Sequence, residues 1–371
     1  MVNLDKRLKE IRELIDDGAY FTINRARQYG KTTLLAALAK SLSRDYVIVS
    51  MDFQAMGNES FQNENTFSLS FLALFCRKLE NISKNNAWEF GDLLSELKEI
   101  VRMKPEKFVL LDLFSYLLDI CKKIPKPVVL MIDEVDTATN NQVFLDFLAQ
   151  LRNYYLERET DGTVTFQSVI LAGVYDIKNM RRKIRPEEDH KTNSPWNIAA
   201  DFDVDMSFNE EDISGMLEEY ETDNMTGMDI RKVSRLIYEY TSGYPFLVSK
   251  ICKIIDERLA GEGIFHDKSA AWTKEGILEA VKILLSEKNM LFDSLTEKIE
   301  TYPELKNILY ALLFRGQSIV YNPDNDAIGI AQMFGFTKID AETGAVVVAN
   351  RIFETRLYNY FLTAQEIQGL H

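Results

Sequence analysis

The stretch that decides the fold is YFTINRARQYGKTTLLAALAKSL, which runs from Tyr20 to Leu42. A short β-rich run, YFTIN, leads into a polar loop, and TLLAALAKSL (33–42) has the spacing and composition of a helix. Between them lie Gly30, Lys31 and Thr32, the last three fixed positions of a phosphate-binding loop of the pattern GxxxxGK[ST]. In such a loop, backbone N–H groups and the N-terminus of the following helix surround the phosphates.

Arg25 stands at the first fixed position of this pattern, where a glycine is usual. The first glycine mainly shapes the turn, whereas Gly30 lets the backbone approach a phosphate closely, so Arg25 weakens the motif without abolishing it. Lys31 is expected to contact the β- and γ-phosphates, and Thr32 to hold Mg²⁺ by its hydroxyl. A polar loop that only caps a helix is the alternative. The predicted nucleotide-binding residues of the loop are Arg25, Ala26, Arg27, Gln28, Tyr29, Gly30, Lys31, Thr32 and Thr33.

A second element, PVVLMIDEVD (127–136), is an apolar strand that ends in two acids. We expect Asp133 to hold Mg²⁺, because this ion prefers oxygen ligands and keeps several waters. Glu134 is the predicted general base, which together with Lys31 forms the predicted catalytic pair. Acids at the carboxyl end of a strand lie where ligands bind in open α/β sheets. Two solvated acids at a strand end are the alternative, which the phosphate loop upstream makes less attractive.

The first half of the chain alternates predicted helices with nearly continuous apolar runs, which is typical of an α/β fold with a parallel sheet covered on both faces. Besides 20–24, strands are predicted at 46–53, 128–133, 166–174 and 201–208. Helices are predicted at about 4–17, 33–42, 66–82, 88–102, 106–124 and 141–159.

The pattern changes twice after this half. From Ser207 to about Ser286 it is almost wholly helical, which predicts a helical lid. From about 290, a helix (304–314), a short helix (326–335), a hairpin and a last helix (351–362) give the outline of a winged-helix domain. The predicted domains are therefore a P-loop core over 1–206, a lid over 207–289 and a winged helix over 290–371.

Composition excludes several classes of protein. The 371 residues carry a formal net charge of −14, which repels nucleic acid unless a local basic patch exists. The densest basic cluster, at 181–185, is followed at once by acids (187–189). No apolar run is long enough for a bilayer, and the N-terminus does not read as a signal peptide. Three separate cysteines argue against disulfides and zinc, so we expect a cytoplasmic protein.

With these motifs, the chain resembles archaeal-type and STAND-like P-loop ATPases, relatives of the AAA+ class. ARQYGKTT resembles their phosphate loop, and IDEVD resembles their Walker B strand end. SGYPFLVSKIC (242–252) is similar to their GxP element, in which Gly243 and Pro245 would open a lid helix near the adenine. The tail VVVANRIFETRLYNYF (346–361) resembles the winged-helix end of bacterial AAA-like domain ATPases.

The resemblance implies an ATPase that takes ATP and Mg²⁺ and switches the lid and winged helix with its nucleotide state. It also implies a homo-oligomer or a protein partner, since many such proteins continue into a PD-(D/E)xK-like nuclease domain. The sequence ends at His371 without room for that domain, and is expected to be a part of a longer protein or a short member of the group.

Several positions keep two interpretations. The strand at 166–174 carries Gly173 where related ATPases place a polar sensor, so Tyr175 or Asp176 could substitute or the sensor could be absent. Arg181, Arg182 or Arg185 could contact a γ-phosphate or be a solvated loop. Gln54 could position the catalytic water or cap a strand. Pro245 suits the first turn of any helix, and Trp196 is more simply a packed aromatic than a contact to a partner.

Two functions other than an ATPase remain open. One is a nucleotide-gated scaffold that does not hydrolyse ATP and holds a partner, such as a nuclease, inactive. The other is a DNA-binding regulator that uses the winged helix. The stretch NDAIGIAQMFGF (325–336), which would read DNA, has no Lys or Arg, and residues 300–371 hold eight acids against five bases. We therefore expect a docking or regulatory role for the winged helix rather than a DNA-binding one.

Overall fold

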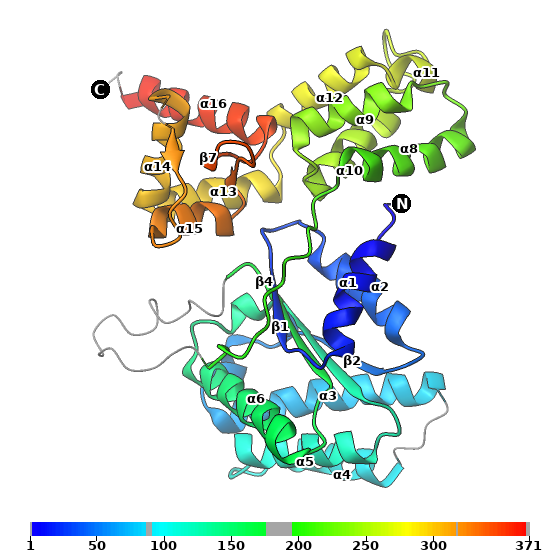
Figure 1. Ribbon diagram of the computed structural model, residues 1–371, viewed down its shortest axis with the longest axis vertical. Helices are drawn as coiled ribbons and strands as arrows, with labels where there is room; N and C mark the ends of the chain where they lie inside the picture. The colour runs from blue at the N-terminus through cyan, green and yellow to red at the C-terminus, as the bar shows by residue number, and fades with distance from the viewer. Residues whose placement is uncertain (1, 87–90, 176–194, 317, 369–371) are drawn as a thin grey trace. The chain divides into compact units, whose positions relative to one another are not determined.

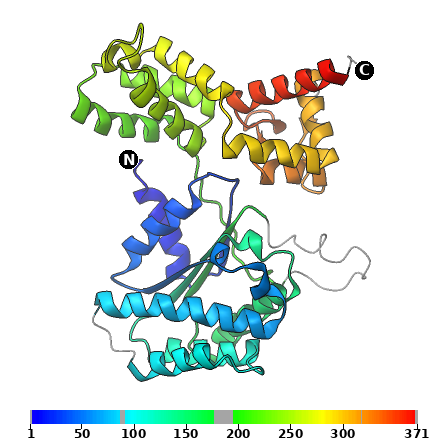
Figure 2. The same cartoon turned by 180° about the vertical axis from the view of Figure 1, so that it is seen from behind.

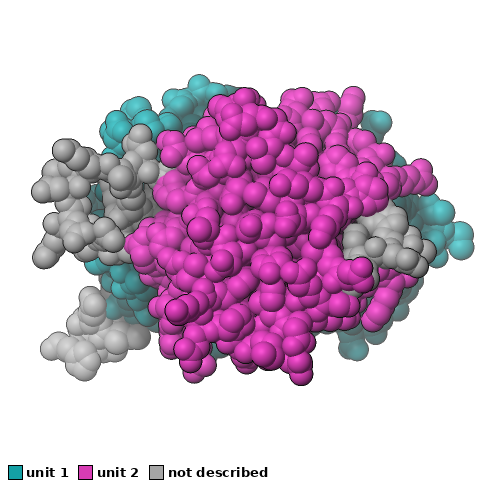
Figure 3. All heavy atoms as spheres, turned by 90° about the horizontal axis from the view of Figure 1, so that it is seen from below, with its two compact units in different colours: residues 1–4, 26–30, 205–371 teal, residues 5–25, 31–204 magenta. Residues whose placement is uncertain are grey.

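The computed structural model describes residues 2–86, 91–175, 195–316 and 318–368 (Figures 1 and 2). It separates into two units (Figure 3). Unit 2 comprises residues 5–25 and 31–204, and unit 1 comprises residues 1–4, 26–30 and 205–371. The phosphate loop is divided by this partition, because its middle residues group with unit 1 and its flanks with unit 2. The predicted boundaries at 206 and 289 stay predictions.

Unit 2 contains a parallel sheet with the strand order β1-β4-β3-β2. Its strands are β1 (Phe21–Asn24), β2 (Val47–Asp52), β3 (Val128–Asp133) and β4 (Ser168–Gly173). Every residue of β3 and β4 is buried, which explains why both read as continuous apolar runs. One strand, β4, therefore lies between the strand that enters the phosphate loop and the strand that ends in Asp133.

Helices cover both faces of the sheet, as predicted. On one side lie α1 (Asp5–Asp16) and α2 (Lys31–Leu42), which begins two residues before the predicted start. On the other side lie α3 (Glu64–Asn86), α4 (Gly91–Met103), α5 (Leu110–Lys123) and α6 (Gln142–Asp161) (Figures 1 and 2).

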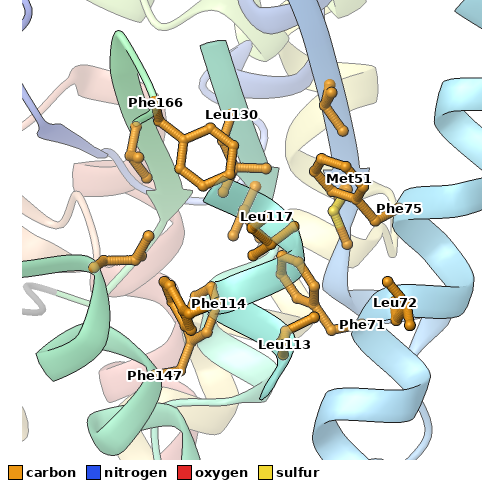
Figure 4. Packing of buried hydrophobic residues seen from close by; sticks show 14 of the residues in the cluster. Met51, Phe71, Leu72, Phe75, Leu113, Phe114, Leu117, Leu130, Phe147 and Phe166 are labelled. Carbon is orange, nitrogen blue, oxygen red and sulfur yellow. The ribbon is translucent and has the colours of Figure 1, made fainter. Parts of the chain in front are cut away.

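The second of these layers packs on the sheet in a hydrophobic core that is rich in phenylalanine (Figure 4). Phe71 of α3, Phe114 of α5 and Phe147 of α6 pack together under the strands, with the Phe71 and Phe147 ring centroids 5.1 Å apart. Fully burying one such side chain stabilises a fold by roughly 1.5–3 kcal/mol. This core fixes the sheet whose carboxyl edge carries Asp133.

The strand predicted at 201–208 is wrong. In the part of the chain that the structure describes, a single parallel bridge, between Phe21 and Ala200, extends the sheet beyond β1. The carbonyl oxygen of Val204 instead accepts a hydrogen bond of 2.9 Å from the Arg25 guanidinium. The Arg25 side chain thus occupies a backbone carbonyl that could otherwise accept a hydrogen bond from a neighbouring strand. The segment therefore runs beside β1 without forming a ladder of backbone hydrogen bonds.

Unit 1 begins with the helical region expected for a lid. Its helices are α8 (Glu210–Asn224), α9 (Ile230–Thr241), α10 (Pro245–Ile254), α11 (Lys268–Ala271) and α12 (Lys274–Ser286), and a π-helical turn, Ile255–Leu259, extends α10. The Asn209 side chain caps α8 by accepting a hydrogen bond from the Asp212 N–H, and the Asp212 carboxylate accepts a hydrogen bond from the Asn209 N–H. This reciprocal cap explains why the helical pattern starts at the SFNEED sequence.

We call residues 290–368 of unit 1 the C-terminal segment. It contains α13 (Met290–Thr301), α14 (Pro303–Phe314), β5 (Ile319–Val320), α15 (Asp326–Met333), β6 (Thr337–Ile339), β7 (Ala345–Val348) and α16 (Arg351–Gln368). The hairpin β6–β7 joins β5 in an antiparallel sheet of order β5-β7-β6. The predicted helices and hairpin are present, α13 and β5 were not predicted, and the assignment as a winged helix stays a prediction.

Candidate functional site

The middle of the phosphate loop belongs to unit 1 and has the backbone of an anion-binding nest. Gln28 has φ 56° and Gly30 has φ 83°, so two left-handed residues flank Tyr29. Alternation of this kind turns successive N–H groups toward one point, where they can surround a phosphate. A Cβ at Gly30 would meet no protein atom within 4 Å, so the space beside this glycine is open. The loop therefore fits a phosphate group.

Lys31 and Arg25 flank this loop and belong to unit 2. Lys31 is 7% exposed, and its Nζ donates a 2.8 Å hydrogen bond to the Arg25 carbonyl oxygen. The Arg25 guanidinium donates to the carbonyls of Asn24 and Val204 and lies 5.4 Å from the Phe202 ring centroid. Arg25 thus fastens the start of the loop to the segment beside β1, a role that a glycine could not perform.

The structure brings Thr32 and Asp133 together, as the predicted magnesium site requires. The Thr32 Oγ1 donates a 2.6 Å hydrogen bond to Asp133 Oδ2, although 101 positions separate the two residues. Asp133 is 7% exposed, and its Oδ1 accepts from the Glu134 backbone N–H at 2.9 Å. Within the described residues, no cluster of three or more His, Cys, Asp or Glu side chains could hold a metal. A hydroxyl and one carboxylate suit Mg²⁺, which keeps waters and phosphate oxygens as its other ligands.

Glu134 adopts a left-handed backbone conformation, with φ 53° and ψ 40°. A non-glycine residue in this region costs of order 1 kcal/mol, and such residues concentrate at functional sites. The 3₁₀ turn Val135–Thr137 follows directly. The chain therefore turns sharply at the predicted general base, immediately after the predicted metal ligand.

Asp136 is a residue of this region that the sequence did not single out. Its Oδ2 accepts a 2.7 Å hydrogen bond from the Val174 N–H, and its Oδ1 accepts from Tyr175 N–H at 2.9 Å. A Cβ at Gly173 would lie only 2.8 Å from Asp136 Oδ1. Gly173 thus makes room for a carboxylate that ties the loop after β3 to the end of β4. The absence of a polar side chain at Gly173 was visible in the sequence, but this use of the space was not.

The end of β2 places a further acid beside the site. Asp52 is the register partner of Asp133, and its Oδ1 accepts a 2.8 Å hydrogen bond from the Gln54 backbone N–H. Gln54 itself is exposed in the 3₁₀ turn Phe53–Ala55. Asp52 therefore lies beside Asp133, the predicted metal ligand, at the same edge of the sheet. The sequence could have indicated Asp52, because it is an acid at the end of a predicted strand.

In unit 1, the predicted lid element is a tight turn before α10. Gly243 has φ +72°, and a Cβ there would lie 1.8 Å from the Phe208 carbonyl oxygen. The Phe208 N–H in turn donates to the Gly243 carbonyl at 2.9 Å. Pro245 is buried at the first position of α10. The close approach of Phe208 is therefore sufficient to explain why a glycine is needed at position 243. The approach of this turn to a purine ring stays a prediction.

We expect Gly243→Ala to lower the free energy of unfolding by more than about 2 kcal/mol, because a backbone clash adds to the cost of a positive φ. Gly227→Ala is the matched control, since Gly227 also has φ +72° but no atom lies within 4 Å of its Cβ position. Urea unfolding of both variants measures the difference. Equal losses in the two variants would show that the approach to Phe208 is unimportant.

Tyr244, which lies between Gly243 and Pro245, was not singled out from the sequence. It is 3% exposed, and burial raises the pKa of its hydroxyl, so it remains a protonated donor. The hydroxyl donates to the carbonyl oxygen of Arg27, and the ring meets the Tyr29 ring edge-on with centroids 4.6 Å apart. Tyr29 also shares a 2.7 Å hydrogen bond with the Ser207 hydroxyl. An aromatic residue in a Gly-x-Pro turn was the available signal.

Other candidate residues have simpler outcomes. Asp176, Arg181, Arg182 and Arg185 lie outside the described residues. Trp196 is fully buried and stacks on Tyr20 at 6.0 Å, which confirms the packed interpretation. No helix among the described residues is long and apolar enough to cross a bilayer.

Comparisons with known proteins give a family and a fold. A family model described as an AAA-like domain matches residues 5–306. Comparison with curated proteins found no match. The solved Walker-type ATPase PABY2304 of Pyrococcus abyssi has a TM-score of 0.63 and 13% identity, with 96% of each chain covered. The ORC2 protein of Aeropyrum pernix, solved in ADPNP–ADP complexes, has a TM-score of 0.48 and 12% identity, with 96% of this chain and 93% of that one covered.

Proposed function

We propose that this chain, which belongs to the AAA-like domain family, binds Mg²⁺–ATP at its phosphate loop and hydrolyses it. The hydrogen bond between Thr32 and Asp133 carries this proposal. It joins the end of the phosphate loop to the acid at the end of β3, which is the pairing that a Mg²⁺–triphosphate site needs. The nest-like backbone of Gln28 and Gly30 and the fold shared with a Walker-type ATPase support it.

Each residue of the site has a separate role in this proposal. The backbone N–H groups of the loop and the Nζ of Lys31 would bind the phosphates, once Lys31 leaves the Arg25 carbonyl. Thr32 and Asp133 would hold Mg²⁺, which when bound neutralises charge on the β- and γ-phosphate oxygens. Glu134 would accept the proton of the attacking water. Asp136 holds the loop after β3 to β4 and so limits the freedom of Glu134.

Titration calorimetry of the full chain with ATP, with and without Mg²⁺, tests the binding step, and a phosphate-release assay tests hydrolysis. We expect saturable binding of one ATP that Mg²⁺ strengthens, and release of phosphate only when Mg²⁺ is present. Absence of binding to ATP at millimolar concentration would refute the proposal.

The Thr32→Val variant tests the magnesium site separately. It removes the hydroxyl and keeps the shape of the side chain, and Thr32 is exposed, so stability should change little. We expect the Mg²⁺-dependent gain in ATP affinity to fall about tenfold, a typical loss for a metal-site ligand or its partner. Affinity measured in EDTA should match the wild type. A loss of affinity that is equal with and without Mg²⁺ would show that Thr32 contacts phosphate rather than metal.

A nucleotide-gated scaffold is the second candidate, and one observation favours it. The end of β4 carries Gly173 at the position where related ATPases have a polar sensor, and the nearby Asp136 already accepts hydrogen bonds from the backbone. Such a site would bind ATP without hydrolysing it. A phosphate-release assay at low and high protein concentration separates the two candidates, since assembly could supply a missing group.

We also propose that the nucleotide state biases the arrangement of the lid (207–289) and of a winged helix (290–371), as in STAND-like ATPases. A role of this winged helix in binding DNA is disfavoured by its excess of acids. Weak binding of duplex DNA without a steep dependence on salt would agree with that view.

A further inference from the structure

We propose that Tyr244 is a positioning residue that holds loop residues 26–30 in their anion-binding conformation and makes that conformation depend on the packing of the C-terminal segment. The proposal rests on the proposed function for its meaning, since the loop is taken to bind ATP. All the contacts that carry it lie within unit 1.

The first contact is between Tyr244 and the loop. The Tyr244 hydroxyl donates to the Arg27 carbonyl, which directly precedes the left-handed Gln28. A left-handed residue other than glycine persists only where its surroundings hold it. The hydrogen bond fixes the peptide group between Arg27 and Gln28, and the Tyr29 ring packs against the Tyr244 ring on the other side of Gln28. Tyr244 therefore holds the loop on both sides of its strained residue.

The second contact is between Tyr244 and α16. The ring of Phe353 meets the Tyr244 ring edge-on with centroids 5.3 Å apart, and Phe353 is fully buried. Asn350 fixes the start of α16, because its Oδ1 accepts a 2.9 Å hydrogen bond from the Phe353 N–H. One ring thus touches both the phosphate loop and the C-terminal segment.

Two further observations place the C-terminal segment close to Tyr244 and the loop. A Cβ at Gly335, which follows α15, would lie 2.7 Å from the Ala26 Cβ and 3.8 Å from a Tyr244 ring carbon. Lys338 of β6 donates a 3.0 Å hydrogen bond from Nζ to the Ser242 hydroxyl, two residues before Tyr244. The C-terminal segment therefore supports the turn, the ring and the loop together, and a change in its packing has a short path to residues 26–30.

Coupling of this kind is reciprocal. If packing of the C-terminal segment holds the loop ready for phosphate, then a bound phosphate must stabilise that packing by the same factor. A partner that pulls α16 away would weaken ATP binding, and ATP would resist the partner. Tyr244 contacts both the loop and α16, so a small substitution at this residue is the most direct way to uncouple them.

The Tyr244→Phe variant removes the hydrogen bond to Arg27 and keeps both ring contacts. We expect it to weaken the affinity for Mg²⁺–ATP about fivefold, the worth of one hydrogen bond. Phe353→Leu, in the C-terminal segment, should weaken it about threefold through the lost ring contact. The double variant should lose less than the product of the two, because both changes act through one side chain. Tyr238→Phe is the control, since Tyr238 lies on α9, before the turn that carries Tyr244, and its substitution should leave affinity unchanged.

Hydrogen exchange in the absence of nucleotide provides a readout that does not depend on ATP. Amides of residues 26–30 should exchange at least about three times faster in Tyr244→Phe and in Phe353→Leu than in the wild type and in Tyr238→Phe. Unchanged exchange of these amides in both variants overturns the proposal. If the wild type binds no ATP, the proposed function fails, while the exchange experiment still decides the role of Tyr244.

Discussion

Replacing Lys31 with alanine is expected to lower the affinity for Mg²⁺–ATP by about 10- to 150-fold, because a charged hydrogen bond to phosphate contributes roughly 1.5–3 kcal/mol. The ammonium group is already placed at the loop, where it donates to the Arg25 carbonyl. Lys31 is nearly buried, so its four-carbon stem also packs in the wild type. Titration calorimetry with ATP measures the loss directly.

Two companion variants separate charge from packing in this prediction. Lys31→Met keeps most of the buried stem and removes the charge, so it should lose as much affinity as Lys31→Ala while keeping more thermal stability. Lys40→Ala removes an exposed lysine from the last turn of the same helix, α2, and should bind ATP as the wild type does. ATP affinity within threefold of the wild type in both Lys31 variants would place the phosphates elsewhere.

The sequence predicted the parts of the fold in which local pattern and long-range packing agree. The strands β3 and β4 are apolar throughout because both of their faces are covered, so each could be read without its neighbours. The family resemblance rested on the phosphate loop, IDEVD, SGYP and the tail, and the family was confirmed by a match over residues 5–306, which does not include the tail. The segment 201–208 was predicted wrongly because its alternating pattern suits a strand, but the guanidinium of Arg25 occupies the Val204 carbonyl.

The sequence predicted the residues expected to contact nucleotide and metal, but it did not predict the residues that hold them in place. The approach of Thr32 to Asp133 followed from the motifs, since both were expected to share one metal ion. The roles of Asp136 and Tyr244 depend on partners far along the chain, namely the end of β4 for Asp136 and the loop and α16 for Tyr244. A side chain whose partners are non-local leaves no periodic signal in one sequence.

Replacing Glu134 with glutamine is expected to leave ATP binding within about twofold of the wild type and to reduce phosphate release by about 10²–10⁴-fold, the usual contribution of a general base. Glutamine has the same shape and pays the same cost for the left-handed backbone, so the free energy of unfolding should not change. The amide cannot accept the proton of the attacking water. Measured together, unchanged affinity and lost turnover identify a residue that acts only on the chemical step.

The neighbouring acid provides the sharpest alternative to this assignment. Asp52 stands opposite Asp133 in the register of β2 and β3, so its strand end could also deliver a carboxylate to the attacking water. If Glu134→Gln retains turnover and Asp52→Asn loses it, the base lies on β2, and the left-handed turn at Glu134 serves only to bend the chain. Glu59→Gln, at an exposed glutamate in the second 3₁₀ turn after β2 (Asn58–Phe61), is the matched control and should retain full turnover. Loss of turnover in Glu134→Gln alone assigns the proton transfer to the residue that follows the metal ligand.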